Sequence, residues 1–223
     1  MTPPFSIEIE PLLQQKCPEL RLGNILCSVQ VNSNYPLLLD NIQTISNAIA
    51  ARTTTNQISQ LANIAATRQA YKALGKKPGR YRPSAEALLR RVVSGKGLYT
   101  VNNIVDLLNL VSISTGFSIG GYDFETIQGA IQLGIGRPNE PYQAIGRGDL
   151  NIANLPIFRD KIGAFGTPTS DAVRTMVQPQ THLFWMVLYA FDGNTVSLEA
   201  AMQQAQDLLT NFAEASDFQT WIC

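Results

Sequence analysis

Hydrophobic and polar residues alternate near the N-terminus and then take a helical spacing. Over residues 24–32 nearly every second position is hydrophobic, which predicts a half-buried strand. From Ile58 to Leu74 hydrophobic residues recur every three or four positions. Gly75 follows, where a left-handed residue commonly ends a helix. The pattern therefore predicts a strand and then a helix over 58–74.

A second helix is predicted directly after a proline. Pro83 marks a break, Ser84 is the expected N-cap, and the helix continues to Val93. Glu86 in the first turn is favourable to the helix dipole. The predicted buried stripe consists of Leu88, Leu89, Val92 and Val93.

The segment from Ile104 to Ile113 is hydrophobic on nearly every side, which predicts a helix buried in the core. Asp106, Asn109 and Ser112 interrupt it at every third position and so share one face. An unpaired buried polar group costs about 1–3 kcal/mol. These three side chains must therefore bond to backbone or line a wet cavity.

The rest of the chain contains mostly strand signals and then one helix. Strands are predicted over 131–135 and, weakly, at 157–158, and the long hydrophobic run 183–191 predicts a central strand. A helix is predicted from Ser197. Helices followed by strands indicate an α+β domain with a mixed or antiparallel sheet and flanking helices, and disfavour a Rossmann fold.

The composition is that of a globular chain. Of the 223 residues, 45% are hydrophobic and 15% are charged, enough to bury a sizeable core. No hydrophobic run approaches the roughly 18 residues of a membrane helix, and the first residues do not resemble a signal peptide. We expect a cytoplasmic protein without a membrane partner. Scattered Cys17, Cys27 and Cys223 are expected to be free thiols.

Positive charge is concentrated in one segment. Residues 68–96 contain nine basic residues and one acid, whereas the remainder contains eight basic and sixteen acidic residues. Such a segment can attract a polyanion. Alternatively, it is a solvated helix pair whose cations neutralise nearby acids. Under the first interpretation the RNA-binding residues are Lys76, Lys77, Arg80, Arg82, Arg90 and Arg91.

Several familiar active-site patterns are absent from the sequence. The glycine-rich stretch 134–139 has Asn139 where a dinucleotide fingerprint needs its third glycine, and 94–97 lacks the spacing of a phosphate loop. His182 is the only histidine and adjoins a predicted strand. One histidine and scattered cysteines form no recognisable metal-ligand set. Neither a cofactor nor a metal is predicted.

One polar constellation remains as a candidate site. Asn102, Asn103, Asp106 and Asn109 lie close in sequence to a predicted glycine-rich turn at 116–123. These groups could position a water against a reactive ester, since holding the reactants together removes much of a barrier. The alternative is that Asp106 and Asn109 satisfy buried loop backbone.

The same residues resemble a known family. The run from Val101 to Asn109, then Gly116 and the segment 121–123, resembles the signature of the B3/B4 domain, the editing region of the bacterial phenylalanyl-tRNA synthetase beta chain. Weaker agreement extends the resemblance over residues 80–191. The stretch 81–91 resembles stand-alone members. The weaker agreement includes Glu140, Ile145, Gly146, Asp160 and Thr181, and Asp171, Arg174 and Thr175 fit the stand-alone subgroup.

The resemblance implies a three-layer α+β fold and a pocket that hydrolyses mischarged aminoacyl-tRNA. It implies one B3/B4-like domain over 1–223, divided into a strand and helices (1–79), the family-like core (80–191) and a C-terminal helix (192–223). We take Asp106, Asn109 and Thr181 as catalytic candidates. The pocket candidates are Asn103, Gly120, Gly121, Gly146, Glu86, Arg174 and His182.

Two positions differ from the synthetase pattern. Gly120 stands where the synthetase has a histidine, and Asp160-Lys161-Ile162 stands where it has a further acid. Three hypotheses follow from the sequence. The first is a trans-editing hydrolase of mischarged aminoacyl-tRNA, and the second is a non-catalytic module that binds RNA, an amino acid or another small molecule. The third is an unrelated hydrolase or isomerase that uses Glu86, Asp106 or His182.

Overall fold

The computed structural model, which describes residues 3–223, contains an antiparallel four-stranded sheet at its centre. We call it sheet B, and its strand order is β10-β2-β9-β3. The two inner strands pair over their full length. The strands are β2 (Arg21–Ser28), β3 (Ser118–Asp123), β9 (Leu183–Ala190) and β10 (Ser216–Ile222).

A second four-stranded sheet, sheet A, lies against one face of sheet B. Its order is β1-β4-β7-β8, with β1 parallel to β4 and the other pairs antiparallel. The expected α+β class is confirmed, and both kinds of sheet are present. The strands are β1 (Ile7–Ile9), β4 (Ile131–Ile135), β7 (Pro156–Arg159) and β8 (Ala164–Gly166), besides the small hairpin β5 (Gln143–Ala144) and β6 (Gly148–Asp149).

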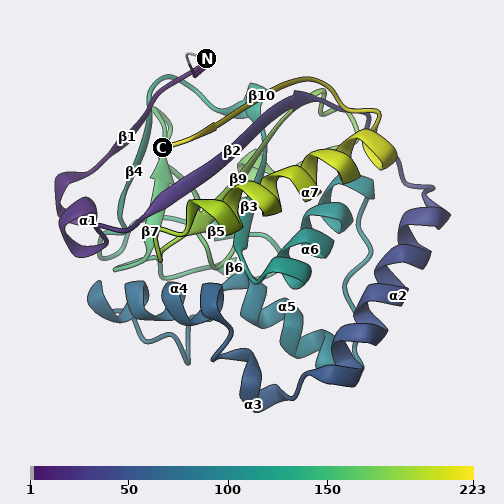
Figure 1. Ribbon diagram of the computed structural model, residues 1–223. Coiled ribbons are helices and arrows are strands. Elements are labelled where there is room, and N and C mark those ends of the chain that lie inside the picture. Colours follow the sequence, from purple (N-terminus) through teal and green to yellow (C-terminus); the bar gives the residue numbers. More distant parts are fainter. Residues whose placement is uncertain (1–2) are drawn as a thin grey trace.

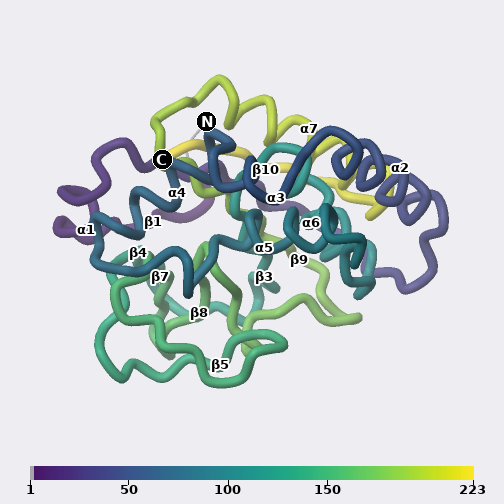
Figure 2. Tube along the Cα trace, turned by 90° about the horizontal axis from the view of Figure 1, so that it is seen from below, coloured from purple at the N-terminus to yellow at the C-terminus, as the bar shows by residue number. Residues whose placement is uncertain are grey.

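Helices cover the opposite face of sheet B (Figures 1 and 2). The four main helices share a hydrophobic cluster with this sheet, and α4 contacts both cores. The helices are α1 (Pro11–Lys16), α2 (Pro36–Arg52), α3 (Thr55–Ile58), α4 (Ala62–Ala73), α5 (Ser84–Val93), α6 (Asn103–Thr115) and α7 (Thr195–Ala213), with two 3₁₀ turns, Phe124–Thr126 and Val173–Thr175.

Sheet B is the middle layer of three. In β9, Phe184 and Met186 belong to the cluster under the helices, whereas Trp185 and Val187 belong to the cluster shared with sheet A. This alternation follows from the two-residue period of a strand. The prediction of a central strand here is confirmed. The half-buried strand predicted over 24–32 is wrong in its exposure, because β2 is buried on both faces.

The first helical segment is shorter than the hydrophobic spacing predicted. Residues 58–74 are divided between α3 and α4, with a turn at 59–61. A capping box between Thr54 and Gln57 starts the short α3. Gly75 has a φ of 86°, as its predicted capping role requires.

The helix predicted over 84–93 is confirmed as α5, but Ser84 is not its cap. Pro83 occupies the N-cap position, and Ser84 is the first helical residue. The backbone N–H of Ser84 instead donates to the carbonyl of Pro168, 2.8 Å away. This bond ties the start of α5 to the segment that follows β8.

The predicted glycine-rich turn is a strand. Gly120 and Gly121 lie within β3, at the edge of sheet B. The Tyr122 ring occupies the space that a Cβ at Gly120 would need, and a Cβ at Gly121 would come 2.5 Å from Leu108. These glycines therefore permit close packing rather than an unusual backbone conformation.

The C-terminal segment contains more than the predicted helix. After α7, strand β10 returns along β2 with an irregular register between Ser216 and Gln219.

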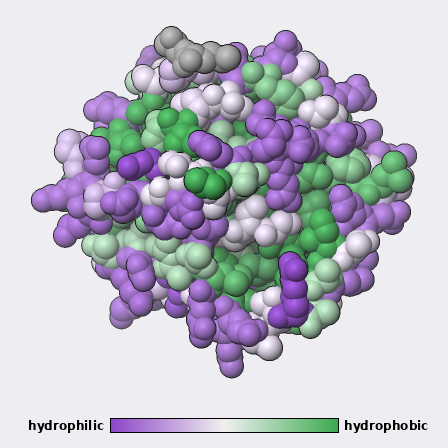
Figure 3. Space-filling view, viewed as in Figure 1, coloured by the Kyte–Doolittle hydropathy of each residue, from purple (hydrophilic) through white to green (hydrophobic). Residues whose placement is uncertain are grey.

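No helix among residues 3–223 is long and hydrophobic enough to cross a membrane. The three cysteines are free, with Cys17 and Cys27 buried. Figure 3 shows hydrophobic side chains at the middle of the face that carries α2, α6 and α7, within a mainly hydrophilic outline.

Candidate functional site

A groove of about 810 Å³ lies between the helical layer and the loops of the β-rich half. Helices α5 and α6 form one wall, and the loop 145–147 with the segment 167–171 forms the opposite wall. Its volume falls within the ~300–1,000 Å³ usual for ligand sites. The hydrophobic lining comprises Ala87, Leu88, Val101, Ile104, Val105, Leu108, Ile119, Ile145, Met176, Val177 and Phe184.

Five cationic side chains line this groove. Arg82, Lys96 and Arg147 are exposed, and Arg90 and Arg91 are partly buried. Four of the five come from the basic segment recognised in the sequence, whereas Arg147 comes from the hairpin on the other wall. A groove edged with one sign of charge attracts an anionic ligand.

Asp171 lies in the opposite wall. Its Oδ2 accepts a hydrogen bond from the backbone N–H of Gly121, 3.1 Å away. The residue is partly exposed, but its Oδ1 atom is buried. Within residues 3–223 no donor reaches this atom in good hydrogen-bond geometry, although the hydroxyl of Tyr122 and the backbone N–H of Thr167 lie near the carboxyl group. Burial raises the pKa of Asp171 to about 7, against the opposing effects of the N–H of Gly121 and the hydroxyl of Tyr122. Carboxyl groups with such pKa values are characteristic of functional sites.

Hydroxyl groups line the same wall. Thr167, Thr169 and Ser170 all contribute to the groove. Thr169 bonds the buried hydroxyl of Tyr71 at 2.8 Å. The Oγ1 of Thr167 is buried and lacks a partner among the described residues. The groove thus combines a hydrophobic interior with unsatisfied polar atoms near Asp171.

The structure brings some of the predicted site residues to this groove. Asn109 lines it from α6, Gly121 from β3 and Gly146 from the hairpin. Of the predicted RNA-binding residues, Arg90 and Arg91 line it from α5, and Arg82 lines it from two positions before that helix. The remaining candidates lie outside the groove.

Asp106 is held within the helical layer. Its Oδ2 accepts from the hydroxyl of Tyr35 at 2.9 Å, and its Oδ1 accepts from the backbone N–H of Val101 at 3.0 Å. Burial raises the pKa of Asp106, while these two bonds oppose the rise. Both oxygens are therefore engaged, although Asp106 also lines a smaller hollow beside α2, and Asn109 of the same face lines the groove. Ser112, on the same face, donates to the carbonyl of Phe117.

Asn103 and Thr181 also have structural partners. The amide of Asn103 accepts from the backbone N–H of Asn32 and donates to the carbonyls of Gln30 and Phe212, at 2.7–2.9 Å. Thr181 donates to Asp123 at 2.8 Å. Asn103 therefore joins three segments, and Thr181 fastens the start of β9 to the end of β3. Gly120, as described above, packs against Tyr122.

Glu86 is completely buried beneath the basic segment. Its carboxylate pairs with Arg68 at 2.7 Å and with Arg90 at 3.0 Å. Arg91 is also engaged, because it donates to the carbonyl of Gly97 at 3.1 Å and stacks on Tyr99. Glu86 thus positions a groove cation but does not line the groove itself.

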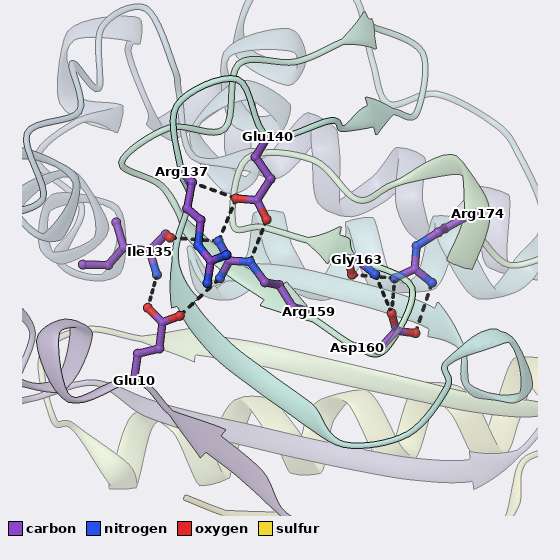
Figure 4. A network of polar contacts seen from close by, with 8 residues as sticks. All are labelled: Glu10, Ile135, Arg137, Glu140, Arg159, Asp160, Gly163 and Arg174. Atoms are coloured by element: carbon purple, nitrogen blue, oxygen red, sulfur yellow. Dashed lines mark hydrogen bonds and ion pairs between the residues drawn. The ribbon is translucent and has the colours of Figure 1, made fainter.

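Arg174 belongs to a network of ion pairs outside the groove lining (Figure 4). It donates to Asp160 at 2.7 Å and to the carbonyl of Gly163 at 2.8 Å. Burial would raise the pKa of Asp160, but backbone N–H groups and Arg174 lower it overall. In the same figure, Arg159 bridges Glu140 and Glu10. His182 is exposed directly before β9, away from the groove lining.

Lys76 is a buried structural cation. It donates to the carbonyls of Asn151 and Ala153 at 2.7 Å each, and burial lowers its pKa to about 8. Its ammonium group also lies 3.6 Å from the centre of the Tyr81 ring. These contacts contradict its predicted availability to RNA. Lys77 and Arg80 are exposed but do not line the groove.

Comparison with known proteins decides the family. The sequence model of the B3/4 domain matches residues 66–214, which is most of the chain. The chain belongs to the B3/4 domain family. The resemblance seen in the signature residues is thereby confirmed. No curated protein matches the chain.

A solved structure similar to this B3/4 domain is an N-terminal fragment of the phenylalanyl-tRNA synthetase beta-subunit from Pyrococcus horikoshii. The identity is 12% and the TM-score is 0.45. The alignment covers 98% of the present chain but only 50% of that fragment, so the chain spans about half of its length.

The most informative residue of this B3/4 domain was not among the predicted site residues. In the sequence Asp171 is only a matching position, because the synthetase pattern has its further acid directly after the residue that corresponds to Asp160. The usable signal was the polar run 167–171, which contains two threonines, a serine and an aspartate. No cluster of potential metal ligands occurs among residues 3–223.

Proposed function

We propose that the groove binds the aminoacylated end of a tRNA and that the domain hydrolyses its ester bond. The proposal is carried by one observation: a groove edged by five cations is also lined by Asp171, a carboxyl group whose pKa burial raises to about 7. The resemblance of the signature residues to an editing region supports this class of substrate.

The groove has surfaces for both parts of such a substrate. Exposed Arg82, Lys96 and Arg147 suit the phosphates of a nucleic acid strand. The hydrophobic interior suits the side chain of the attached amino acid. In this arrangement the ester carbonyl lies between the cations and the wall that contains Asp171.

Asp171 is the proposed catalytic base. As a carboxylate, it accepts a proton from a water whose oxygen bonds to the ester carbonyl carbon. The carbon–oxygen bond to the ribose then breaks, and the proton passes to the leaving ribose oxygen. The products are a free amino acid and a tRNA with an unmodified terminal hydroxyl. A base with a pKa near the working pH suits both transfers, and Asp171 has a pKa of about 7.

The test is deacylation of a panel of correctly and incorrectly charged tRNAs. We expect at least one mischarged tRNA to be hydrolysed faster than in buffer. Asp171→Asn should slow this reaction by roughly 10²–10⁴-fold, the usual contribution of a general base. Exposed Asp207 on α7 provides a matched control, and Asp207→Asn should leave the rate unchanged. Absence of hydrolysis across the panel would reject the hydrolase.

A second candidate is a non-catalytic module for an amino acid or another small molecule. The specific observation in its favour is the extensive hydrophobic lining of a groove of small-ligand size. This alternative predicts a measurable heat of binding for a free amino acid. Because it includes no phosphate contacts, it predicts no salt-dependent binding of RNA. Steeply salt-dependent tRNA binding would reject it.

A further inference from the structure

A second hollow adjoins the groove. It has a volume of about 560 Å³ and lies between α2 and the loop that connects α5 to α6. Lys96, Tyr99 and Thr100 line both spaces, so this loop forms a ridge between them. Figure 1 shows the connecting segment running beside α2 on its way to α6.

Tyr99 presents an aromatic face on this ridge. The residue is 57% exposed. The guanidinium of Arg91 stacks on it, 3.7 Å from the ring centre. Arg91 also bonds the carbonyl of Gly97, so the ring and its loop are anchored to α5. An anchored aromatic ring with an exposed surface is the standard platform for a nucleobase.

The other wall of the hollow carries two amide side chains. Gln43 and Asn47 lie one helical turn apart on α2, and the Nε2 of Gln43 donates to the Oδ1 of Asn47 at 2.8 Å. The Oε1 of Gln43 and the Nδ2 of Asn47 take no part in this bond. One can accept from, and the other donate to, the amino group and adjacent ring nitrogen of adenine.

We propose that the second hollow binds the terminal adenine of the tRNA, stacked on Tyr99 and bonded by Gln43 and Asn47. This inference rests on the proposed function. The ribose then crosses the ridge at Thr100, and the aminoacyl ester enters the groove. The second hollow thus holds the base of the substrate, and the groove holds its ester.

The test uses uncharged RNA minihelices that end in CCA, in CC, or in CC followed by purine riboside, which lacks the amino group. The wild-type protein should bind the CCA end about tenfold tighter than the CC end, as one base stack provides. It should bind the purine-ended helix at an intermediate strength. Tyr99→Ala should abolish the difference between CCA and CC, and Tyr99→Phe should preserve it.

A separate experiment tests the role of Gln43 and Asn47. The double variant Gln43→Ala and Asn47→Ala should bind adenine and purine ends equally, while still preferring both to CC. The matched control is the exposed pair Gln203 and Asp207 on α7, joined in the same way at 2.9 Å, whose double alanine variant should behave as wild type.

The outcomes separate the two proposals. Equal binding of CCA and CC by the wild-type protein would overturn the adenine site and leave the groove as a phosphate and ester site. Failure to bind any of the three RNAs would overturn the proposed function and the adenine site with it.

Discussion

The unpaired oxygen of Asp171 has an energetic consequence for the folded chain. A buried carboxylate oxygen without a hydrogen-bond partner destabilises the charged form, so burial raises the pKa of this group. Strain of this kind is common at functional sites, where it is offset elsewhere in the structure. Asp171 therefore links the stability of the protein to the ionisation that the proposed reaction uses.

The stability of the wild-type protein should fall as the pH rises from about 4 to about 7. Asp171 titrates near 3.8 when unfolded and near 7 when folded, so the folded state holds the extra proton in this window. Below the window the effect is absent, and above it the loss is complete. Urea unfolding of wild type and Asp171→Asn across this range measures it. An equal pH dependence in both proteins would contradict the assignment.

Sequence reasoning located polar residues at this scale but not their partners. It recognised Asp106 as a polar group that a buried helix must satisfy. It could not show that the partner is Tyr35, 71 positions earlier in the chain. It likewise could not show that Lys76 is buried against loop carbonyls, because such contacts depend on how distant segments pack.

At the scale of elements, strand β3 determines how closely helix α6 can pack against sheet B beside the groove. Gly121 lines the groove, donates to Asp171 and lies against Leu108 of α6. The missing side chain lets helix and strand approach, so one residue connects packing to the site. Sequence patterning identified α5 and β4 from their hydrophobic periods, and α6 and β9 from their long hydrophobic runs. It missed short edge strands such as β1 and β8, which have too few residues to display a period.

Gly121→Ala should destabilise the protein by about 1–3 kcal/mol, because the new methyl group would overlap Leu108 and press on Phe184. It should also weaken ligand binding in the groove. Gly79 is the control, since a Cβ there meets no atom within 4 Å. Gly79→Ala should change the stability by less than about 0.5 kcal/mol. Thermal or urea unfolding compares the two, and equal effects would show that the space beside Gly121 is not limiting.

At the scale of the whole molecule, three layers place a cationic helix opposite a polar loop. Sheet B separates the two hydrophobic cores, and the groove opens where α5 and the chain after β8 meet beside its edge strand β3. The composition revealed the charge asymmetry, but it did not show which cations line the groove and which have structural partners. Some cations of the basic segment line the groove. Lys76 instead donates to a loop carbonyl, and Arg68 pairs with the buried Glu86. Only the fold brings Arg147 to the same groove.

The most direct test of the central claim is the salt dependence of tRNA binding. The triple variant Arg82→Ala, Lys96→Ala and Arg147→Ala should bind less tightly than wild type. Its slope of log affinity against log salt should be shallower by about two to three counterions. A control triple variant of exposed cations outside the groove, Lys16→Ala, Arg52→Ala and Lys161→Ala, should keep the wild-type slope. Equal slopes for the two triple variants would contradict tRNA binding at this groove.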